Sequence, residues 1–319
     1  MYYIITFLAI LAAELLYFRI AKKLHIVDRP NERSSHKKVA LLGAGVIFWF
    51  AVLYFSLTHK MDLLPLLAGA TLLAGVSYID DMRGVPSWLR LLAQIAAVVG
   101  SFYTAVATLE IWQMLLLVVF FVGVLNVYNF MDGINGMLAA YSLVVVGTFG
   151  YLNLFVQHFV NIEFIATILT AIMVFGVFNF RKTARCFSGD VGSIVMGFIV
   201  LYLILRYDAA IPDNGENLSY LCFIIVFLTD GVLTIVKRFL TGRNIFEAHR
   251  EHLYETLVNN LHVPHLCVSA IYATLQLAIN VGYLLVGDKN LYTLVVAFTL
   301  VLTYGLFFYY CNVKKGIRF

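Results

Sequence analysis

Five polar clusters interrupt an otherwise apolar chain, and their residue types are those that bind divalent cations and phosphates. Carboxylate and amide oxygens are hard ligands that suit Mg²⁺, whereas Arg, Lys and His donate charge-assisted hydrogen bonds to phosphate oxygens. Each cluster lies at the edge of an apolar run, where polar side chains are costly and mark functional sites. The combination predicts phosphoryl transfer, in which a site mainly positions the reactants and neutralises their charge.

Two of the clusters supply most of the acidic candidates. Asp80 and Asp81 close an apolar run, and adjacent carboxylates repel each other unless a cation lies near them. Asn126, Asn129 and Asp132 are spaced three residues apart, so a helix presents them as one polar stripe at its end. Such a stripe suits an oxygen-ligated metal or a sugar-nucleotide, and a hydrogen-bond cluster between helices is the structural alternative.

The other three clusters are mainly basic. Asp190 begins an apolar run shortly after Arg185, and a helix that starts there offers free amide groups to phosphate. N-capping is the structural alternative for Asp190. The remaining phosphate-binding candidates are Asn31, Arg33, His36, Arg243, His249, Arg250 and His252. Anchoring of the loops by positive charge and an inert surface helix are the alternatives for these residues.

The composition determines what kind of molecule carries these clusters. The chain has 319 residues, of which 62% are hydrophobic and 13% are charged. An ordinary soluble domain is about 25% charged, so the composition excludes a soluble enzyme, a disordered chain and a nucleic-acid-binding domain. It predicts an integral membrane protein. We see no linker or internal repeat, and therefore expect a single domain over 1–319.

Membrane-spanning segments follow from the apolar runs, because a bilayer core requires about 20 apolar residues per helix. Eleven runs of about that length predict an all-α, polytopic integral membrane protein with about eleven transmembrane helices. The runs cover 2–20, 41–57, 63–79, 91–108, 111–131, 137–156, 164–180, 191–207, 218–236, 265–286 and 291–311.

The basic residues predict how these helices are oriented. Eleven crossings place nineteen of the 22 Lys and Arg on one side, which the positive-inside rule makes cytoplasmic. The N-terminus is then outside and the C-terminus cytoplasmic. All five polar clusters fall on the cytoplasmic side, and the predicted active-site loops are 21–40, 80–90, 126–136, 181–193 and 237–264. The membrane location further predicts that one substrate is a lipid.

The ordered motifs resemble one family of membrane enzymes. They are Asp-Arg-Pro-Asn-Glu-Arg-Ser-Ser-His from Asp28, Asp80-Asp81 with Arg90 and Gln94, Asn-x-x-Asn-x-x-Asp-Gly from Asn126, Gly-Asp-Val-Gly-Ser from Gly189 and His-Arg-x-His-Leu from His249. This string is similar to that of the bacterial polyprenyl-phosphate N-acetylhexosamine-1-phosphate transferases. The last motif is most like the subgroup that initiates O-antigen or capsule synthesis.

The resemblance implies a reaction. An N-acetylhexosamine-1-phosphate, or its N-acetyl-6-deoxyhexosamine counterpart, passes from a UDP-sugar to undecaprenyl phosphate, releasing UMP. The product starts a cell-surface polysaccharide such as lipopolysaccharide O-antigen or capsule. The enzyme is expected in the bacterial inner membrane with its site facing the cytoplasm. The implied cofactor is Mg²⁺, with Mn²⁺ as an alternative, and the partners are undecaprenyl phosphate, a UDP-N-acetylhexosamine and the lipid bilayer.

The resemblance also implies roles for individual residues. The catalytic set is Asp80, Asp81, Asp132 and Asp190, and the metal ligands are Asp190, Asp81 and Asn129. The other candidates, including Asn126 and Arg185, are expected to bind substrate. Three alternatives stay open: an enzyme of the phospho-MurNAc-pentapeptide translocase type, a secondary transporter or lipid flippase, and a homodimer in place of a monomer.

Overall fold

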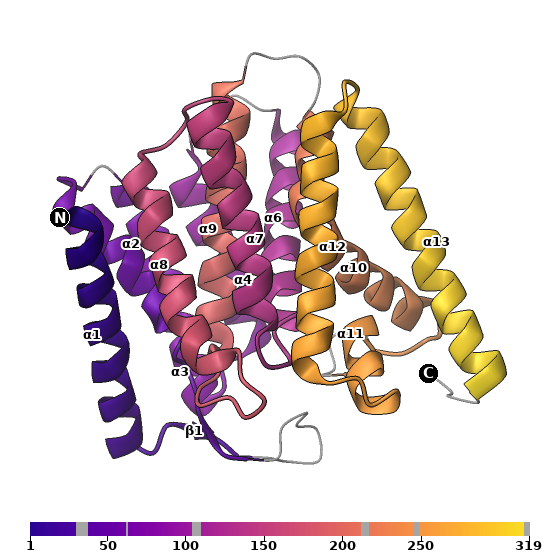
Figure 1. The fold of residues 1–319 in the computed structure, drawn as a ribbon, viewed down its shortest axis with the longest axis horizontal. Helices are drawn as coiled ribbons and strands as arrows, with labels where there is room; N and C mark the ends of the chain where they lie inside the picture. Colours follow the sequence, from indigo (N-terminus) through magenta and orange to yellow (C-terminus); the bar gives the residue numbers. More distant parts are fainter. Residues whose placement is uncertain (30–37, 62, 104–109, 212–216, 245–248, 316–319) are drawn as a thin grey trace.

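The computed structural model shows a bundle of helices that run between two ends of the molecule (Figure 1). It describes residues 1–319 except 30–37, 62, 104–109, 212–216, 245–248 and 316–319. The long helices in the described part are α1 (Tyr2–Lys23), α2 (Val46–Thr58), α3 (Leu64–Arg83), α4 (Ser87–Ser101), α6 (Ile111–Phe130), α7 (Met137–Phe155), α8 (Ile162–Asn179), α9 (Gly189–Ala210), α10 (Ile225–Leu240), α12 (His265–Leu285) and α13 (Lys289–Lys315). The short elements are strands β1 (Val27–Asp28) and β2 (Ala40–Leu41), the 3₁₀ helix η1 (Asn217–Ile224), α11 (Leu253–Glu255) and the π-helix η2 (Thr256–Asn260).

Each of the eleven apolar runs predicted to span the membrane overlaps one of the long helices. Eight helical segments in the described part are long and apolar enough to cross a bilayer, counting η1 with α10 as one. Helices α2 and α4 are apolar but shorter, and α3 ends in the charged residues Asp80, Asp81 and Arg83. The all-α, multi-pass class is therefore confirmed, whereas the count of eleven crossings stays a prediction.

Helix α9 is the centre of the bundle. It packs against α2, α3, α6 and α7, and its side chains from Val191 to Leu201 are all buried. A helix that is apolar around its whole circumference is stable only when other helices surround it. The residues at the start of α9 are consequently held in place from several directions.

A small antiparallel sheet is the one departure from the predicted all-α class in the described residues. Strand β1 pairs with β2 in the register Val27 with Leu41 and Asp28 with Ala40. Leu41 also bridges to the segment before α9: its amide donates to the carbonyl of Arg185 at 3.1 Å, and its carbonyl accepts from the amide of Phe187 at 2.8 Å. Pairing satisfies backbone groups that would otherwise be buried without partners, and it joins two loops that are distant in the sequence.

Two glycines allow α2 to touch the start of α9. A Cβ atom added at Gly192 would lie 2.6 Å from the Cα of Gly45, which is closer than real side chains approach. The amide of Gly45 also donates to the carbonyl of Ser188 at 3.0 Å. The backbone at Gly45 therefore lies directly against the start of α9.

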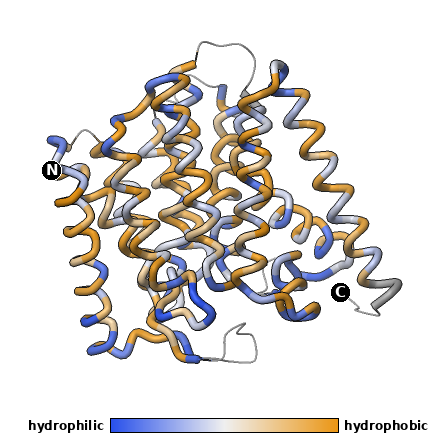
Figure 2. The backbone as a smooth tube through the Cα atoms, in the orientation of Figure 1, coloured by the Kyte–Doolittle hydropathy of each residue, from blue (hydrophilic) through white to orange (hydrophobic). Residues whose placement is uncertain are grey.

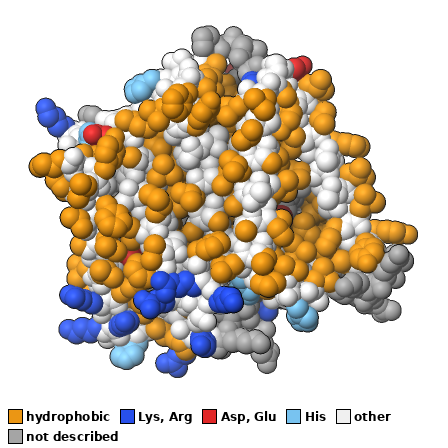
Figure 3. Space-filling model, in the orientation of Figure 1, with side chains coloured by type: hydrophobic (Ala, Val, Ile, Leu, Met, Phe, Trp, Pro, Cys, Tyr) orange, Lys and Arg blue, Asp and Glu red, His pale blue; other side chains and the backbone are white. Residues whose placement is uncertain are grey.

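Polar residues gather at one end of the bundle, the lower end in Figure 2. Lys and Arg side chains line the lower rim of the face shown in Figure 3, whereas the flanks of the helices are apolar. This distribution is the one predicted from the sequence. Both the C-terminal end of α3 and the first residue of α9 lie at this end, which therefore holds the functional candidates.

The substitution Gly192→Ala should destabilise the protein, because the new methyl group overlaps Gly45. Overpacking of this kind costs about 1–3 kcal/mol. The matched control is Gly147→Ala in α7, where an added Cβ meets nothing within 4 Å. Thermal unfolding of the detergent-purified variants measures the effect. Equal melting temperatures for Gly192→Ala and Gly147→Ala would contradict the close packing of α2 on α9.

Candidate active site

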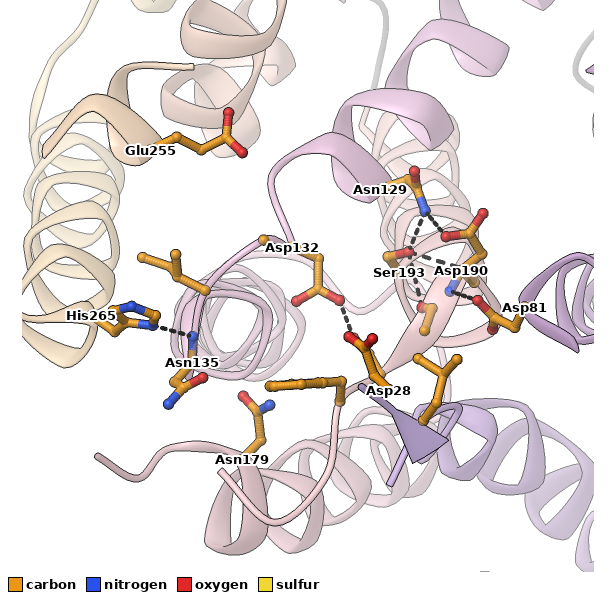
Figure 4. A pocket seen from close by; sticks show the side chains of 16 residues that line it. Asp28, Asp81, Asn129, Asp132, Asn135, Asn179, Asp190, Ser193, Glu255 and His265 are labelled. Atoms are coloured by element: carbon orange, nitrogen blue, oxygen red, sulfur yellow. Dashed lines mark hydrogen bonds between the residues drawn. The ribbon is translucent and has the colours of Figure 1, made fainter. Parts of the chain in front are cut away.

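An acidic cavity of about 350 Å³ opens at the polar end of the bundle. Three carboxylates and one amide among its lining residues were predicted from the sequence: Asp81 from the end of α3, Asn129 from α6, Asp132 from the turn after α6, and Asp190 from the start of α9. Figure 4 shows Asp81, Asn129 and Asp190 on one side, with Asp132 facing them. The structure therefore brings together side chains that lie up to 109 residues apart in the chain.

Asp81 docks α3 onto the start of α9. Its two carboxylate oxygens accept hydrogen bonds from the backbone amides of Asp190 at 3.0 Å and Val191 at 3.3 Å. The first amides of a helix lack partners within the helix and carry partial positive charge, so a carboxylate is stable there. Gly189 makes room for this contact, since its φ is +68° and an added Cβ would collide with the Asp81 carboxylate.

Asn129 and Arg90 orient the carboxylate of Asp190. The Asn129 side-chain amide donates to Asp190 Oδ1 at 2.8 Å and to Ser193 Oγ at 3.1 Å. The Arg90 guanidinium lies 3.6 Å from Asp190 Oδ2 and donates to Asp80 Oδ2 at 2.7 Å. Because the nitrogen of Asn129 is used in this way, its oxygen is the atom left for a ligand.

Asp80 has a different environment from its neighbour Asp81. It accepts from Arg90 and, at 2.6 Å, from the backbone amide of Val85, and it does not line the cavity. Asp80 thus holds the turn between α3 and α4 and fixes Arg90 beside Asp190. The predicted roles of Asp80 in catalysis and Asp81 at the metal stay predictions, but only Asp81 faces the cavity.

Asp132 adds a third carboxylate across from the first two. Its Oδ2 accepts a hydrogen bond from the hydroxyl of Ser188. Burial raises the pKa of Asp132 to about 8; the Ser188 hydrogen bond opposes this rise, and the nearby carboxylates of Asp190 and Asp81 add to it. The cavity is consequently short of positive charge, and a cation bound there would be stabilised by all three carboxylates.

The donor set fits a divalent cation that arrives with a substrate. Within the described residues, no three His, Cys, Asp or Glu side chains converge closely enough to enclose a metal ion. Mg²⁺ is commonly held by one or two carboxylates together with substrate phosphates and water. Carboxylates of Asp81, Asp132 and Asp190 with the amide oxygen of Asn129 are hard ligands of the right kind for such a site.

Sequence reasoning did not single out the residues of the cavity wall opposite these carboxylates, although Asn135 and Glu255 fall in the predicted active-site loops 126–136 and 237–264. This wall includes Asn135, Asn179, Glu255 and His265 (Figure 4). Asn179 Oδ1 accepts from the amide of Gly136 at 2.8 Å, and the amide nitrogen of Asn135 donates to the carbonyl of Arg181 at 2.9 Å. Asn179 and His265 were each a single polar residue at the end of an apolar run, which hydropathy alone cannot separate from a loop residue.

Asn126 lies one turn deeper than Asn129, on the same face of α6. Its amide nitrogen donates to Gln94 of α4 at 2.9 Å and to the carbonyl of Val122 at 2.8 Å. Gln94, Asn126, Asn129 and Asp190 line a second, smaller pocket. The predicted polar stripe of α6 is thus present, but Asn126 serves the contact between α4 and α6 and does not line the acidic cavity.

The loop with His252 is held by a buried carboxylate in α10. Asp230 accepts from the amides of Leu253 at 2.8 Å and Tyr254 at 3.2 Å, and from the Tyr272 hydroxyl at 2.7 Å. The ring of His252 lies 3.5 Å from Asp230 Oδ1. Burial alone would lower the pKa of His252, but the hydrogen bond and the charge of Asp230 raise it. Asp230 therefore caps α11 and fixes His252.

A second acidic residue organises the cations of the same loop. Glu251 pairs with Arg238, with Arg243 at 2.8 Å, and with Lys237 at 3.5 Å. These three cations, together with nearby groups, lower the pKa of Glu251 although its partial burial opposes the shift. Arg243 is therefore bound within the protein in this structure, and its predicted role in substrate binding stays a prediction.

The remaining predicted substrate residues lie outside the cavity or outside the described residues. Asn31, Arg33 and His36 belong to the segment 30–37, which the structure does not describe. Arg185 lines a separate groove beside α1. The rings of His249 and His252 stack 5.0 Å apart near Phe130, and neither these two residues nor Arg250 is part of the cavity lining.

The fold and the site define a class of protein: an all-helical, multi-pass membrane protein with an acidic cavity suited to Mg²⁺ and phosphate at its polar end. Comparison with known proteins agrees with this class. Residues 63–208 match the family described as "Glycosyl transferase family 4". This range contains Asp81, Asn129, Asp132 and Asp190, which are the predicted residues that line the cavity.

Curated relatives point to the same family. The chain is 26% identical over 265 residues to the undecaprenyl-phosphate alpha-N-acetylglucosaminyl 1-phosphate transferase of Escherichia coli (strain K12), and 28% identical over 268 residues to that of Yersinia pestis. Both alignments cover 75% of this chain and 71% of the relative. A probable undecaprenyl-phosphate N-acetylglucosaminyl 1-phosphate transferase of Bacillus subtilis (strain 168) is 21% identical over 276 residues, covering 80% and 76%.

The chain is similar to the polyprenyl-phosphate N-acetylhexosamine-1-phosphate transferases, and both the family match and the curated relatives support this assignment. It is an enzyme of the sugar-1-phosphate transferase type. The resemblance drawn from the five motifs is thereby confirmed at the level of the family and of the enzyme class.

The substitution Asp230→Asn should loosen the loop at His252. The neutral asparagine lacks the negative charge that accepts from the amides of Leu253 and Tyr254 and lies beside His252. Hydrogen bonds to charged groups contribute about 1.5–3 kcal/mol each. Hydrogen exchange at the amides of Leu253 and Tyr254 measures the change. The control is Asp288→Asn. Its carboxylate accepts a hydrogen bond from the backbone amide of Leu291 in the first turn of α13. Unchanged exchange in Asp230→Asn would show that Asp230 does not hold the loop.

Proposed function

We propose that the protein transfers an N-acetylhexosamine-1-phosphate, or an N-acetyl-6-deoxyhexosamine-1-phosphate, from a UDP-sugar to undecaprenyl phosphate. The lipid phosphate attacks the phosphorus that carries the sugar, UMP leaves, and undecaprenyl-diphosphate-sugar forms. The names of the relatives support undecaprenyl phosphate as the acceptor and an N-acetylglucosaminyl group as the one transferred. The acidic cavity supports a metal-assisted reaction of phosphates.

One observation carries this proposal: three carboxylates and an amide from α3, α6 and α9 meet at one cavity at the polar end of the bundle. Carboxylates alone would repel a diphosphate. Mg²⁺, if held there, would neutralise the charge of the transferred phosphoryl group. Asp190, Asp81 and Asn129 are the residues we assign to holding the cation, with Asp132 as the facing carboxylate.

The chain's own residues position the reactants. Arg90, fixed by Asp80 and 3.6 Å from Asp190, places a guanidinium next to the carboxylate cluster, where it can orient a phosphate. A phosphate monoester loses its second proton with a pKa of about 6, so the lipid phosphate is mostly ionised near pH 7. The reaction consequently does not require Asp80 or Asp81 to act as a base.

The opposite wall of the cavity offers contacts for the sugar. The side-chain oxygen of Asn135 is buried and has no hydrogen-bond partner in the part of the chain that the structure describes. A buried acceptor without a partner costs free energy, so a hydroxyl or amide donor from a bound sugar would be favourable there. Glu255 lines the same wall, and burial raises the pKa of its carboxyl to about 7, against the charge of His252.

We further propose that this end of the bundle faces the cytoplasm of a bacterium, in the inner membrane. Lys and Arg gather at the polar end in Figure 3, and positive charge favours the cytoplasmic side. UDP-sugars are cytoplasmic, as the resemblance implies, so the site would meet its donor there. The product would start a cell-surface polysaccharide.

The substitution Asp190→Asn should abolish most of the activity. Losing several kcal/mol of charge stabilisation at a metal site lowers the rate about 100-fold or more. UMP release from UDP-N-acetylglucosamine in the presence of undecaprenyl phosphate measures it, and a panel of UDP-N-acetylhexosamines identifies the donor. Asp288→Asn, far from the cavity, is the matched control and should retain wild-type activity. Wild-type rates for Asp190→Asn would remove that residue from the site.

Removal of the divalent cation should also stop the reaction. The carboxylates of Asp81, Asp132 and Asp190 repel the substrate phosphates when no cation lies between them. UMP release should fall to background in EDTA and return with Mg²⁺, with Mn²⁺ as the alternative activator. Full activity in EDTA would contradict the assignment of Asp81, Asn129 and Asp190 to a metal, even if the sugar transfer itself were confirmed.

A further inference from the structure

The groove beside α1 that Arg185 lines differs in its chemistry from the acidic cavity. It lies between α1, β2 and the end of α8. Its volume is about 830 Å³. Its wall combines basic side chains with apolar ones, and it contains no acidic side chain among its lining residues. None of the assigned steps of sugar-phosphate transfer uses this groove.

Four cations from three separate segments line the groove. Arg19 and Lys22 belong to α1, Lys38 precedes β2, and Arg185 precedes α9. All four side chains are exposed. Within the described residues, none of the four forms an ion pair with an acidic side chain. Among the residues that the structure describes, the groove thus presents a local excess of positive charge.

The apolar part of the groove faces the flank of the bundle. Leu15 and Phe18 of α1 and Phe178 of α8 form it, and Val39 is 57% exposed beside them. The rings of Phe18 and Phe178 pack edge to face with centroids 4.8 Å apart. A groove lined by both cations and apolar side chains matches a molecule with an anionic head and a hydrocarbon tail.

The groove is separated from the acidic cavity by the β1–β2 pair. Val27 and Leu41 line the groove, whereas their neighbours Asp28 and Leu42 line the acidic cavity. The backbone bonds of Leu41 to Arg185 and Phe187 close this wall. A phosphate held by the four cations is therefore on the far side of the strand from Asp81 and Asp190, and is not in the position of a reacting group.

We propose that this groove binds one anionic phospholipid, with its phosphate at Arg19, Lys22, Lys38 and Arg185 and its acyl chain along Leu15 and Phe178. Basic pockets between helices at the cytoplasmic side of a membrane bind anionic head groups, because surface charge and hydrogen bonding act together. The lipid would brace β2 against the segment that leads to Asp190. The site is distinct from that of the acceptor lipid.

The test is binding of phosphatidylglycerol to the full chain, measured by native mass spectrometry with phosphatidylcholine as the zwitterionic reference. Each Lys or Arg near an anionic surface contributes about a fivefold gain in affinity. The variant Arg19→Gln/Lys22→Gln/Arg185→Gln should therefore bind its first phosphatidylglycerol about 100-fold more weakly. The matched control Lys23→Gln/Arg83→Gln/Lys182→Gln removes three exposed cations that do not line the groove, and should bind as the wild type does.

Three results would overturn the proposal. The groove variant could keep wild-type affinity, the wild type could bind phosphatidylcholine as tightly as phosphatidylglycerol, or undecaprenyl phosphate could displace the lipid and show that the groove holds the acceptor. If the triple variant does not fold, Arg185→Gln alone should lose about fivefold. Because the readout is binding, its outcome does not depend on whether the proposed sugar transfer is correct.

Discussion

The carboxylate of Asp81 bound to the first amides of α9 is the contact on which the site depends. It joins the end of α3 to the start of α9 and satisfies amides that no residue within α9 can satisfy. The contact requires glycine at 189, and the neighbouring approach of α2 requires glycine at 45 and 192. Asp190 is thereby presented to Asn129 and Arg90 at distances of 2.8 and 3.6 Å. The same amides lie close to the cavity and add positive potential there.

Much of the fold could be predicted from the sequence, because hydropathy is a local property. All eleven apolar runs overlap long helices, and the polar clusters of α3, α6 and α9 do meet. Sequence spacing could not show which of the adjacent residues Asp80 and Asp81 faces the cavity, since neighbours on a helix point in directions about 100° apart. Nor could it reveal Asn179 and His265, which reach the cavity only through packing of segments distant in the chain.

Local sequence patterns could not predict the short β1–β2 pair or the contacts of the His252 loop, for a related reason. Two-residue strands carry no periodicity, and the pairing of Leu41 with residues 185 and 187 is a long-range contact. His252 was expected to bind diphosphate, but its ring lies against Asp230, a residue 22 positions earlier. Asp230 also accepts hydrogen bonds from the amides of Leu253 and Tyr254, so this carboxylate within α10 serves as a helix cap for α11.

The central claim is that the acidic cavity holds a divalent cation together with the donor diphosphate. The direct test is a titration of the full chain with Mn²⁺, followed by EPR, in the presence and absence of UDP-N-acetylglucosamine. Binding of Mn²⁺ to the nucleotide sugar without protein is the reference. We expect weak binding of Mn²⁺ alone and an affinity about tenfold or more higher with the nucleotide sugar. This gain should be lost in Asp190→Asn. An affinity for Mn²⁺ that the nucleotide sugar and Asp190→Asn both leave unchanged would contradict it.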